Sequence, residues 1–265
     1  MPGNAAVKST ARTVLKAFWP GGIAATLCFL SAMALLFLVC AVNSTLLGTR
    51  AFILNIIIAV FFCFFIAVPC FFGLLRFFRH AVYGNLGAFS SLFYYFSDIK
   101  KYKKSVWFSL MLICRIGAVG MLTFLPYFII RIVELLPFRF ISDSFFLQFS
   151  IVRGVIFFVG LLFFIIMTLR YYIAPMLFVC CDDKHWTEII YVSKHISRYS
   201  SGAFLVLLIG FVGWALLSVL GVTLIYTLPY MLTSYVVHCR FAFNHYNHNI
   251  ELMKKTDFPE YRSTF

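Results

Sequence analysis

The sequence predicts an all-α membrane protein, a polytopic bundle of about six transmembrane helices with amphipathic interfacial helices before spans one, three and five. Its 265 residues are 63% hydrophobic, 20% aromatic and only 12% charged, whereas soluble domains carry about 25% charged residues. The stretch 202–238 contains no Asp, Glu, Lys or Arg. At about 1.5 Å per residue it is long enough to cross a hydrocarbon core of about 30 Å twice. We therefore expect a single integral membrane domain over residues 1–265.

The N-terminal quarter predicts an interfacial helix followed by two spans. Residues 7–18 place apolar side chains on one helical face and basic side chains on the other. The apolar positions are Val7, Ala11, Val14, Leu15 and Phe18, and the basic ones are Lys8, Arg12 and Lys16. Span one is expected over 19–42 and span two over 51–75, where Pro69 predicts a kink.

The middle of the chain repeats this plan. Residues 88–99 predict a second interfacial helix, because their apolar residues recur at helical spacing. A lysine cluster (Lys100, Lys101, Lys103 and Lys104) comes just before span three, which is expected over 106–130. Span four is expected over 149–179.

The last third predicts a third interfacial helix over 186–199, whose apolar stripe consists of Trp186, Ile189, Ile190, Ser193 and Ile196. Spans five and six follow over 202–220 and 222–240, with a tight turn near Gly221 and Thr223. The polar residues 241–265 predict a cytoplasmic tail that frays.

The distribution of positive charge predicts the orientation. Of the 22 Lys and Arg residues, 17 fall in segments on one predicted side, four fall on the other, and Arg115 lies within span three. Because positive residues gather on the inner side, both termini are expected in the cytoplasm. The net charge of +13 lies beside apolar spans rather than on one basic face, so the expected partners are membrane lipids with anionic headgroups and not nucleic acid.

A family resemblance supports the same class. In residues 211–230, a Phe-x-Gly-Trp stretch is followed by a glycine and a Pro-Tyr pair; the matching residues are Phe211, Gly213, Trp214, Gly221, Pro229 and Tyr230. This pattern resembles the bacterial integral membrane family catalogued as DUF975, and the segment YYIAPMLF and the basic N-terminal helix are similar to it as well. The resemblance implies a multi-pass protein of a bacterial plasma membrane and supplies no activity.

Arg115 is the sharpest candidate for a functional residue. A charged side chain near the bilayer centre costs from about 3 to more than 10 kcal/mol unless it is hydrated or paired, and no acidic residue lies within any predicted span. Either Arg115 faces a wet cavity and binds an anionic group, or it is satisfied by helix carbonyls or reaches the interface. The lysine cluster is the second candidate for binding lipid headgroups.

Two clusters are weaker candidates for binding a metal ion. His238, His245 and His248 lie at spacings of seven and three on one helical face, but the acidic and supporting groups of a metal site are not evident around them. Cys180, Cys181, Asp182, Asp183 and His185 form the other cluster, in which Asp182 is a candidate cap for the following helix. We expect neither a resident metal nor a cofactor.

The motifs that would indicate an enzyme are missing: the sequence has no Gly-x-Ser-x-Gly, no His-Glu-x-x-His and no phosphate-binding glycine loop. The leading hypothesis is a non-enzymatic envelope scaffold or regulatory component that binds anionic lipid or another membrane protein. The alternative is a transporter or channel component with a polar path near Arg115. A lipid-modifying enzyme is a third, weaker hypothesis.

Overall fold

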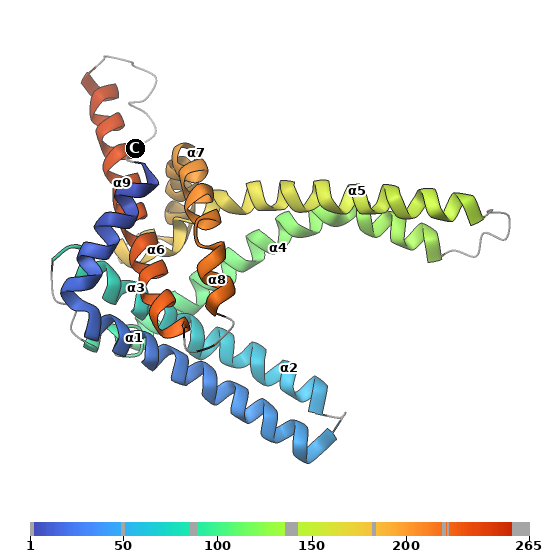
Figure 1. Cartoon of the computed structure of the whole chain (residues 1–265), viewed down its shortest axis with the longest axis horizontal. Helices are drawn as coiled ribbons and strands as arrows, with labels where there is room; N and C mark the ends of the chain where they lie inside the picture. Colours follow the sequence, from blue (N-terminus) through green and yellow to red (C-terminus); the bar gives the residue numbers. More distant parts are fainter. Residues whose placement is uncertain are drawn as a thin grey trace.

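The computed structural model describes residues 3–48, 51–84, 89–135, 143–181, 184–218, 221 and 223–255, and every regular element in these ranges is helical. Three helical hairpins join a common body, and the first two project from it (Figure 1). They are α1 (Asn4–Leu47) with α2 (Ala51–Phe62), α4 (Ile99–Leu135) with α5 (Asp143–Thr168), and α8 (Val212–Ser218) with α9 (Leu224–Lys255). The body contains α3 (Val68–Val82), α6 (Ala174–Cys180), α7 (Trp186–Ile209), the start of α1 and much of α9.

Among the described residues, four helical segments are long and apolar enough to cross a membrane: Asn4–Leu46, Phe52–Val82, Ile99–Ile132 and Ile151–Cys180. A fifth is added if α7 and α8, which meet at 47°, form one broken span. The prediction of an all-α chain with several spans is therefore confirmed, and the described residues contain four or five candidate spans. Predicted span six, 222–240, lies in α9, a helix of 32 residues that is not among these apolar segments.

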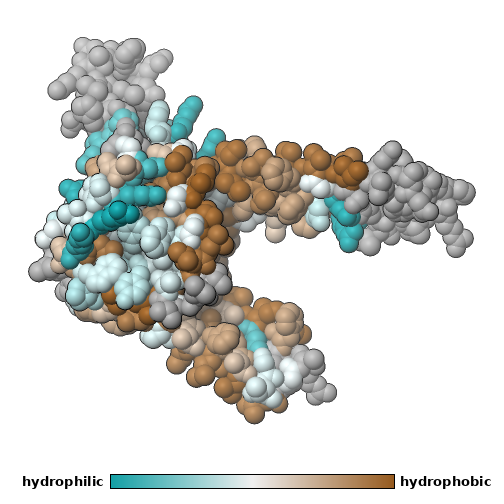
Figure 2. Space-filling model, viewed as in Figure 1, coloured by the Kyte–Doolittle hydropathy of each residue, from teal (hydrophilic) through white to brown (hydrophobic). Residues whose placement is uncertain are grey.

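Large apolar side chains cover the outer surfaces of the first two hairpins. Phe37 and Met121 are each 77% exposed, and Phe52 is 71% exposed. Figure 2 shows this hydrophobic surface along both hairpins, while hydrophilic residues gather on the body. Apolar patches of this extent mark contact with a partner or a membrane, so the hairpins have the surface that lipid requires.

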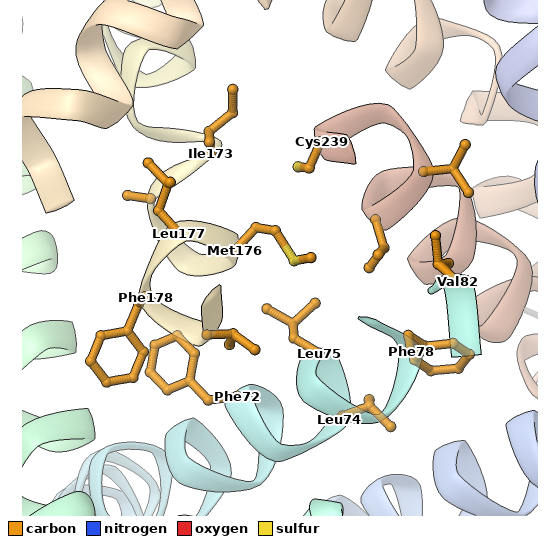
Figure 3. Close-up of a cluster of buried hydrophobic side chains, with 14 of the residues drawn as sticks. Phe72, Leu74, Leu75, Phe78, Val82, Ile173, Met176, Leu177, Phe178 and Cys239 are labelled. Atoms are coloured by element: carbon orange, nitrogen blue, oxygen red, sulfur yellow. The ribbon is translucent and has the colours of Figure 1, made fainter. Parts of the chain in front are cut away.

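The core lies in the body, where α3 packs against α6 and α9 (Figure 3). Phe178 of α6 stacks on Phe108 of α4, with ring centroids 4.4 Å apart, and contacts Phe72 of α3 at 4.7 Å. Tyr95 covers the same ring from a third side at 5.7 Å. Aromatic packing of this kind binds the second hairpin to the body.

The predicted break between an N-terminal amphipathic helix and span one coincides with a kink in α1 at Phe18, whose φ and ψ are −131° and 27°. Pro20 follows, and its ring and missing N–H disturb the helix on its N-terminal side. The apolar stripe formed by Val7, Ala11 and Leu15 is buried. It packs against protein, because this helix contacts α9 and α7, and does not leave its apolar face for the membrane surface as we expected.

The helix expected over 88–99 is not a continuous α-helix. Residues Phe89–Phe93 form a short 3₁₀-helix, and α4 begins only at Ile99. Only Leu92 of this 3₁₀-helix is buried, and its backbone lies against Gly73 of α3, where a β-carbon would overlap the Leu92 carbonyl oxygen. Close backbone contact with α3 therefore holds this segment.

Span two contains an irregular turn where a proline kink was expected. A π-helical turn, Cys63–Ala67, connects α2 to α3 directly before Pro69. Because proline has no N–H, it cannot donate to the carbonyl four residues earlier. That carbonyl, of Phe65, accepts instead from the Tyr102 hydroxyl of α4 at 2.9 Å. The hydrogen bond lost at Pro69 is thus replaced by one between hairpins.

Helix α7 joins predicted interfacial helix three to the beginning of span five without a break. The break lies instead at Gly210, between α7 and α8. A side chain at this position would lie 2.5 Å from the Lys8 ammonium group, which also lies over the Phe211 ring at 5.3 Å. The turn expected at Gly221 is present, and its φ of 70° suits glycine.

Two arginines tie the body together by binding the ends of helices. Arg79 of α3 donates to the carbonyl of Val179 at the end of α6, at 2.9 Å. Arg240 of α9 donates to the carbonyl of Val82 at the end of α3, at 3.0 Å. A cation at a helix C-terminus satisfies a carbonyl without an intrahelical partner and complements the helix dipole. The segment expected to be a fraying tail continues α9 to Lys255, and residues 256–265 lie outside the described residues.

Candidate functional site

The lysine cluster occupies the first turns of α4 and points in several directions, because successive residues of an α-helix are rotated by about 100°. Lys101 lies over the Tyr94 ring at 4.0 Å, and Arg76 of α3 lies over the same ring at 3.5 Å. Lys100 and Lys103 are exposed. The four predicted lysines therefore do not share one site.

Lys104 contributes to a hollow between α4 and the start of α7. The hollow has a volume of about 350 Å³, and it is lined by Lys104, Trp107, Lys184, His185 and Trp186. We call it the α4–α7 hollow. Two cationic side chains and two tryptophans come together here from segments about 80 residues apart, which sequence spacing alone did not predict.

The N-terminus of α7 adds to the positive character of the α4–α7 hollow. His185 is the N-cap, and its Nδ1 accepts from the backbone N–H of Thr187 at 3.5 Å and pairs with the Thr187 hydroxyl at 2.8 Å. The expectation that Asp182 caps this helix is therefore wrong, and Asp182 and Asp183 lie outside the described residues. A helix N-terminus carries about half a positive charge, which favours a nearby anion.

Arg115 reaches the α4–α7 hollow through Trp186. Its guanidinium lies over the Trp186 ring, 5.4 Å from the centroid, and the residue is half-buried. Arg115 does not itself line the hollow. This contact explains how a charged residue is accommodated within an apolar helix, because a tryptophan face attracts a cation and a long side chain can carry its charge toward the interface.

Acidic side chains are described beside the starts of α4 and α7. Of the nine acidic residues, only Asp98 and Glu188 have described side chains. Asp98 accepts from the backbone N–H of Lys100 at 3.0 Å, and Glu188 is exposed in the first turn of α7. The arrangement can hold an anionic group between cations and indole rings.

The histidines of α9 do not form a metal site in the described structure. His238 is buried, and its Nε2 is 3.0 Å from the Tyr172 hydroxyl, which also donates to Ser200 at 2.6 Å. His245 is half-buried, and the side chain of His248 lies outside the described residues. Among the residues described, no three His, Cys, Asp or Glu side chains are grouped closely enough to hold a metal ion.

The sequence did not predict the partners of His238 or of Arg115. Tyr172 and Ser200 are 66 and 38 positions from His238, and Trp186 is 71 positions from Arg115. The sequence offered only a general indication for Trp186, because tryptophans and lysines next to apolar spans mark membrane interfaces.

A comparison with protein-family models, with curated proteins and with solved structures found no match to this chain.

Proposed function

We propose that the chain is a non-enzymatic, multi-pass protein of the bacterial plasma membrane, an envelope scaffold or regulatory component that binds anionic lipid headgroups in the α4–α7 hollow. One observation supports the proposal most strongly. Lys104, Lys184, Trp107 and Trp186 line the same hollow, which lies at the start of a helix long enough to span the membrane. Tryptophan rings favour the headgroup level of a bilayer, and lysines beside them favour anionic lipids.

The proposed topology has six crossings and cytoplasmic termini. Three hairpins support it, since each returns the chain to the side where it began, and α9 pairs with α8 after the turn at Gly221. The third hairpin is the shortest, because α8 has only seven residues. Reporters fused to the two ends test the topology: we expect both on the cytoplasmic side, and reporters on opposite sides would overturn it. Membership of the DUF975 family is part of the same proposal.

Anion binding is tested with the variant Lys104→Gln/Lys184→Gln. The protein is reconstituted in bilayers of phosphatidylcholine with a minority of phosphatidylglycerol, extracted gently, and its retained lipid is analysed by mass spectrometry. Each Lys or Arg close to an anionic surface contributes about 1 kcal/mol, so we expect the enrichment of phosphatidylglycerol to fall roughly 10-fold to 30-fold.

The matched control is Lys100→Gln/Lys103→Gln, which removes the same charge from exposed positions of the same helix. This control should retain most of the enrichment. Equal losses in the two variants would show that only the general positive charge attracts lipid, and the proposed site would be wrong. Retention of full enrichment in both variants would refute it as well.

A further inference from the structure

Another hollow lies between the start of α1 and the third hairpin. It has a volume of about 370 Å³, within the range of about 300–1,000 Å³ that is typical of sites for small molecules. Two cations and four aromatic residues line it: Arg12, Lys16, Trp19, Trp214, Tyr226 and Tyr230. We call it the aromatic groove.

Arg12 marks one end of the aromatic groove, and a stacked aromatic pair marks the other. Arg12 lies over the Tyr230 ring at 5.9 Å, while Trp19, two turns further along α1, stacks on Tyr226 at 5.7 Å. Helices α1 and α9 therefore run in opposite directions here. Arg12 lies at the body end beside Tyr230, whose ring is 6.2 Å from that of Trp214, and the Trp19–Tyr226 pair lies nearer the hairpin turn at Gly221. Lys16 lies between Arg12 and Trp19 along α1.

The cations of the aromatic groove are available to a ligand. Arg12 and Lys16 are both exposed. Among the residues that the structure describes, no acidic side chain forms an ion pair with either of them; Asp98, for example, accepts from the backbone N–H of Lys100. The aromatic walls remain partly uncovered, since Trp214 is 44% exposed and Tyr226 is 53% exposed.

The ligand that fits must carry a negative charge at one end and a long apolar segment at the other. We propose that the aromatic groove binds a single anionic phospholipid of the inner leaflet, with its phosphate between Arg12 and Lys16 and an acyl chain along the walls formed by Trp19, Trp214 and Tyr226. This inference rests on the proposed membrane insertion, but it is independent of anion binding in the α4–α7 hollow.

The four tryptophans of the chain make the proposal directly testable. Trp19 and Trp214 line the aromatic groove, whereas Trp107 and Trp186 line the α4–α7 hollow. In the full-length variant Trp107→Phe/Trp186→Phe, tryptophan fluorescence comes only from the groove. Bromine atoms on an acyl chain quench a tryptophan that they touch, so brominated lipid reports contact with the walls.

The experiment places this variant in phosphatidylcholine bilayers that contain, at the same low mole fraction, either brominated phosphatidylglycerol or brominated phosphatidylcholine. We expect much stronger quenching by phosphatidylglycerol. Adding Arg12→Gln/Lys16→Gln should reduce the preference about 30-fold, which corresponds to about 2 kcal/mol for two charges. Adding Lys100→Gln/Lys103→Gln, at exposed positions that do not line the groove, should leave the preference in place.

Several outcomes would overturn the proposal. Equal quenching by the two brominated lipids before the cations are removed would show that the groove does not select an anionic lipid. Little quenching by either lipid would show that a second copy of the chain or another protein covers the groove. The single variant Lys16→Gln guards against misfolding, because Lys16 is exposed; an unchanged preference in it and in the double variant would also refute the proposal.

Failure of this inference is distinguishable from failure of the proposed function. A chain that does not insert into the bilayer would be released by alkaline carbonate, whereas an inserted chain without the lipid site would resist extraction and show no preference. Loss of lipid enrichment in Lys104→Gln/Lys184→Gln with an intact preference in the groove would leave the present inference standing.

Discussion

Substituting Gly73 by alanine tests whether α3 and the 3₁₀-helix Phe89–Phe93 pack backbone against backbone. A β-carbon at this position would overlap the carbonyl oxygen of Leu92 and lie 2.7 Å from its carbonyl carbon and 3.1 Å from its α-carbon. These atoms belong to the main chain and cannot rotate away as the end of a side chain could. The whole 3₁₀-helix must therefore move, or α3 must shift within the core.

The expected cost exceeds that of an ordinary overpacked core. Inserting a methyl group into a well-packed site costs about 1–3 kcal/mol when side chains can adjust, and here the backbone must adjust. Alanine would otherwise favour the helix by about 1 kcal/mol over glycine. We expect a net loss of about 3 kcal/mol, which lowers the Tm of a chain of this size by roughly 6–12 °C.

The assay is thermal unfolding of the purified protein in detergent, followed by tryptophan fluorescence. The matched control is Gly117→Ala in α4, where a β-carbon would meet no atom within 4 Å. It should leave the Tm unchanged or raise it slightly, because alanine has the higher helix propensity. If Gly73→Ala unfolded at the same temperature as Gly117→Ala, the contact between Gly73 and Leu92 would not exist as described.

Two further predictions concern hydrogen bonds to helix carbonyls. Tyr102→Phe should destabilise the chain by about 0.5–1.5 kcal/mol, because it removes the hydroxyl that donates to the Phe65 carbonyl. Adding Pro69→Ala should recover part of this loss by restoring the missing backbone N–H, and thermal unfolding of both single variants and the double variant measures this coupling; strict additivity would contradict it. Arg240→Ala should cost about 1.5–3 kcal/mol, since a charged donor is lost from the end of α3. Arg170→Ala, at an exposed position, should change stability by no more than about 0.5 kcal/mol, and equal losses would refute the capping role.

The sequence predicted the long apolar helices well, because length and hydropathy are properties of one segment. The predicted boundary between the helix 7–18 and span one coincides with the kink at Phe18, and the predicted turn at Gly221 is present. Both depend on a proline or glycine that acts on its immediate neighbours. The sequence also singled out Arg115 and Lys104. It could not show that these two residues approach Lys184 and Trp186, because that depends on how the second hairpin lies against α7.

The amphipathic helices show that an apolar stripe in the sequence does not reveal what covers it. An apolar stripe shows that one face avoids water, and both lipid and protein satisfy that requirement. The N-terminal stripe and the α7 stripe are both buried in the body, with Ala11 and Ile190 at 0% exposure. In each helix the basic face is the part that remains outside, so their charges can still lie at the membrane surface.

Helix α9 shows that a segment without charged residues can be packed inside the protein instead of facing lipid. Its first half contains Thr233, Ser234 and His238, all nearly inaccessible, and lipid offers no partner for such groups. His238 finds one in the Tyr172 hydroxyl, and Thr233 bonds a backbone carbonyl of its own helix. Polar residues in an otherwise apolar helix thus indicate a position inside the protein, where α9 contacts α1, α3, α7 and α8. The same inward position places one face of α9 against Arg12 and Trp19, so a helix that is not among the candidate spans forms a wall of the aromatic groove.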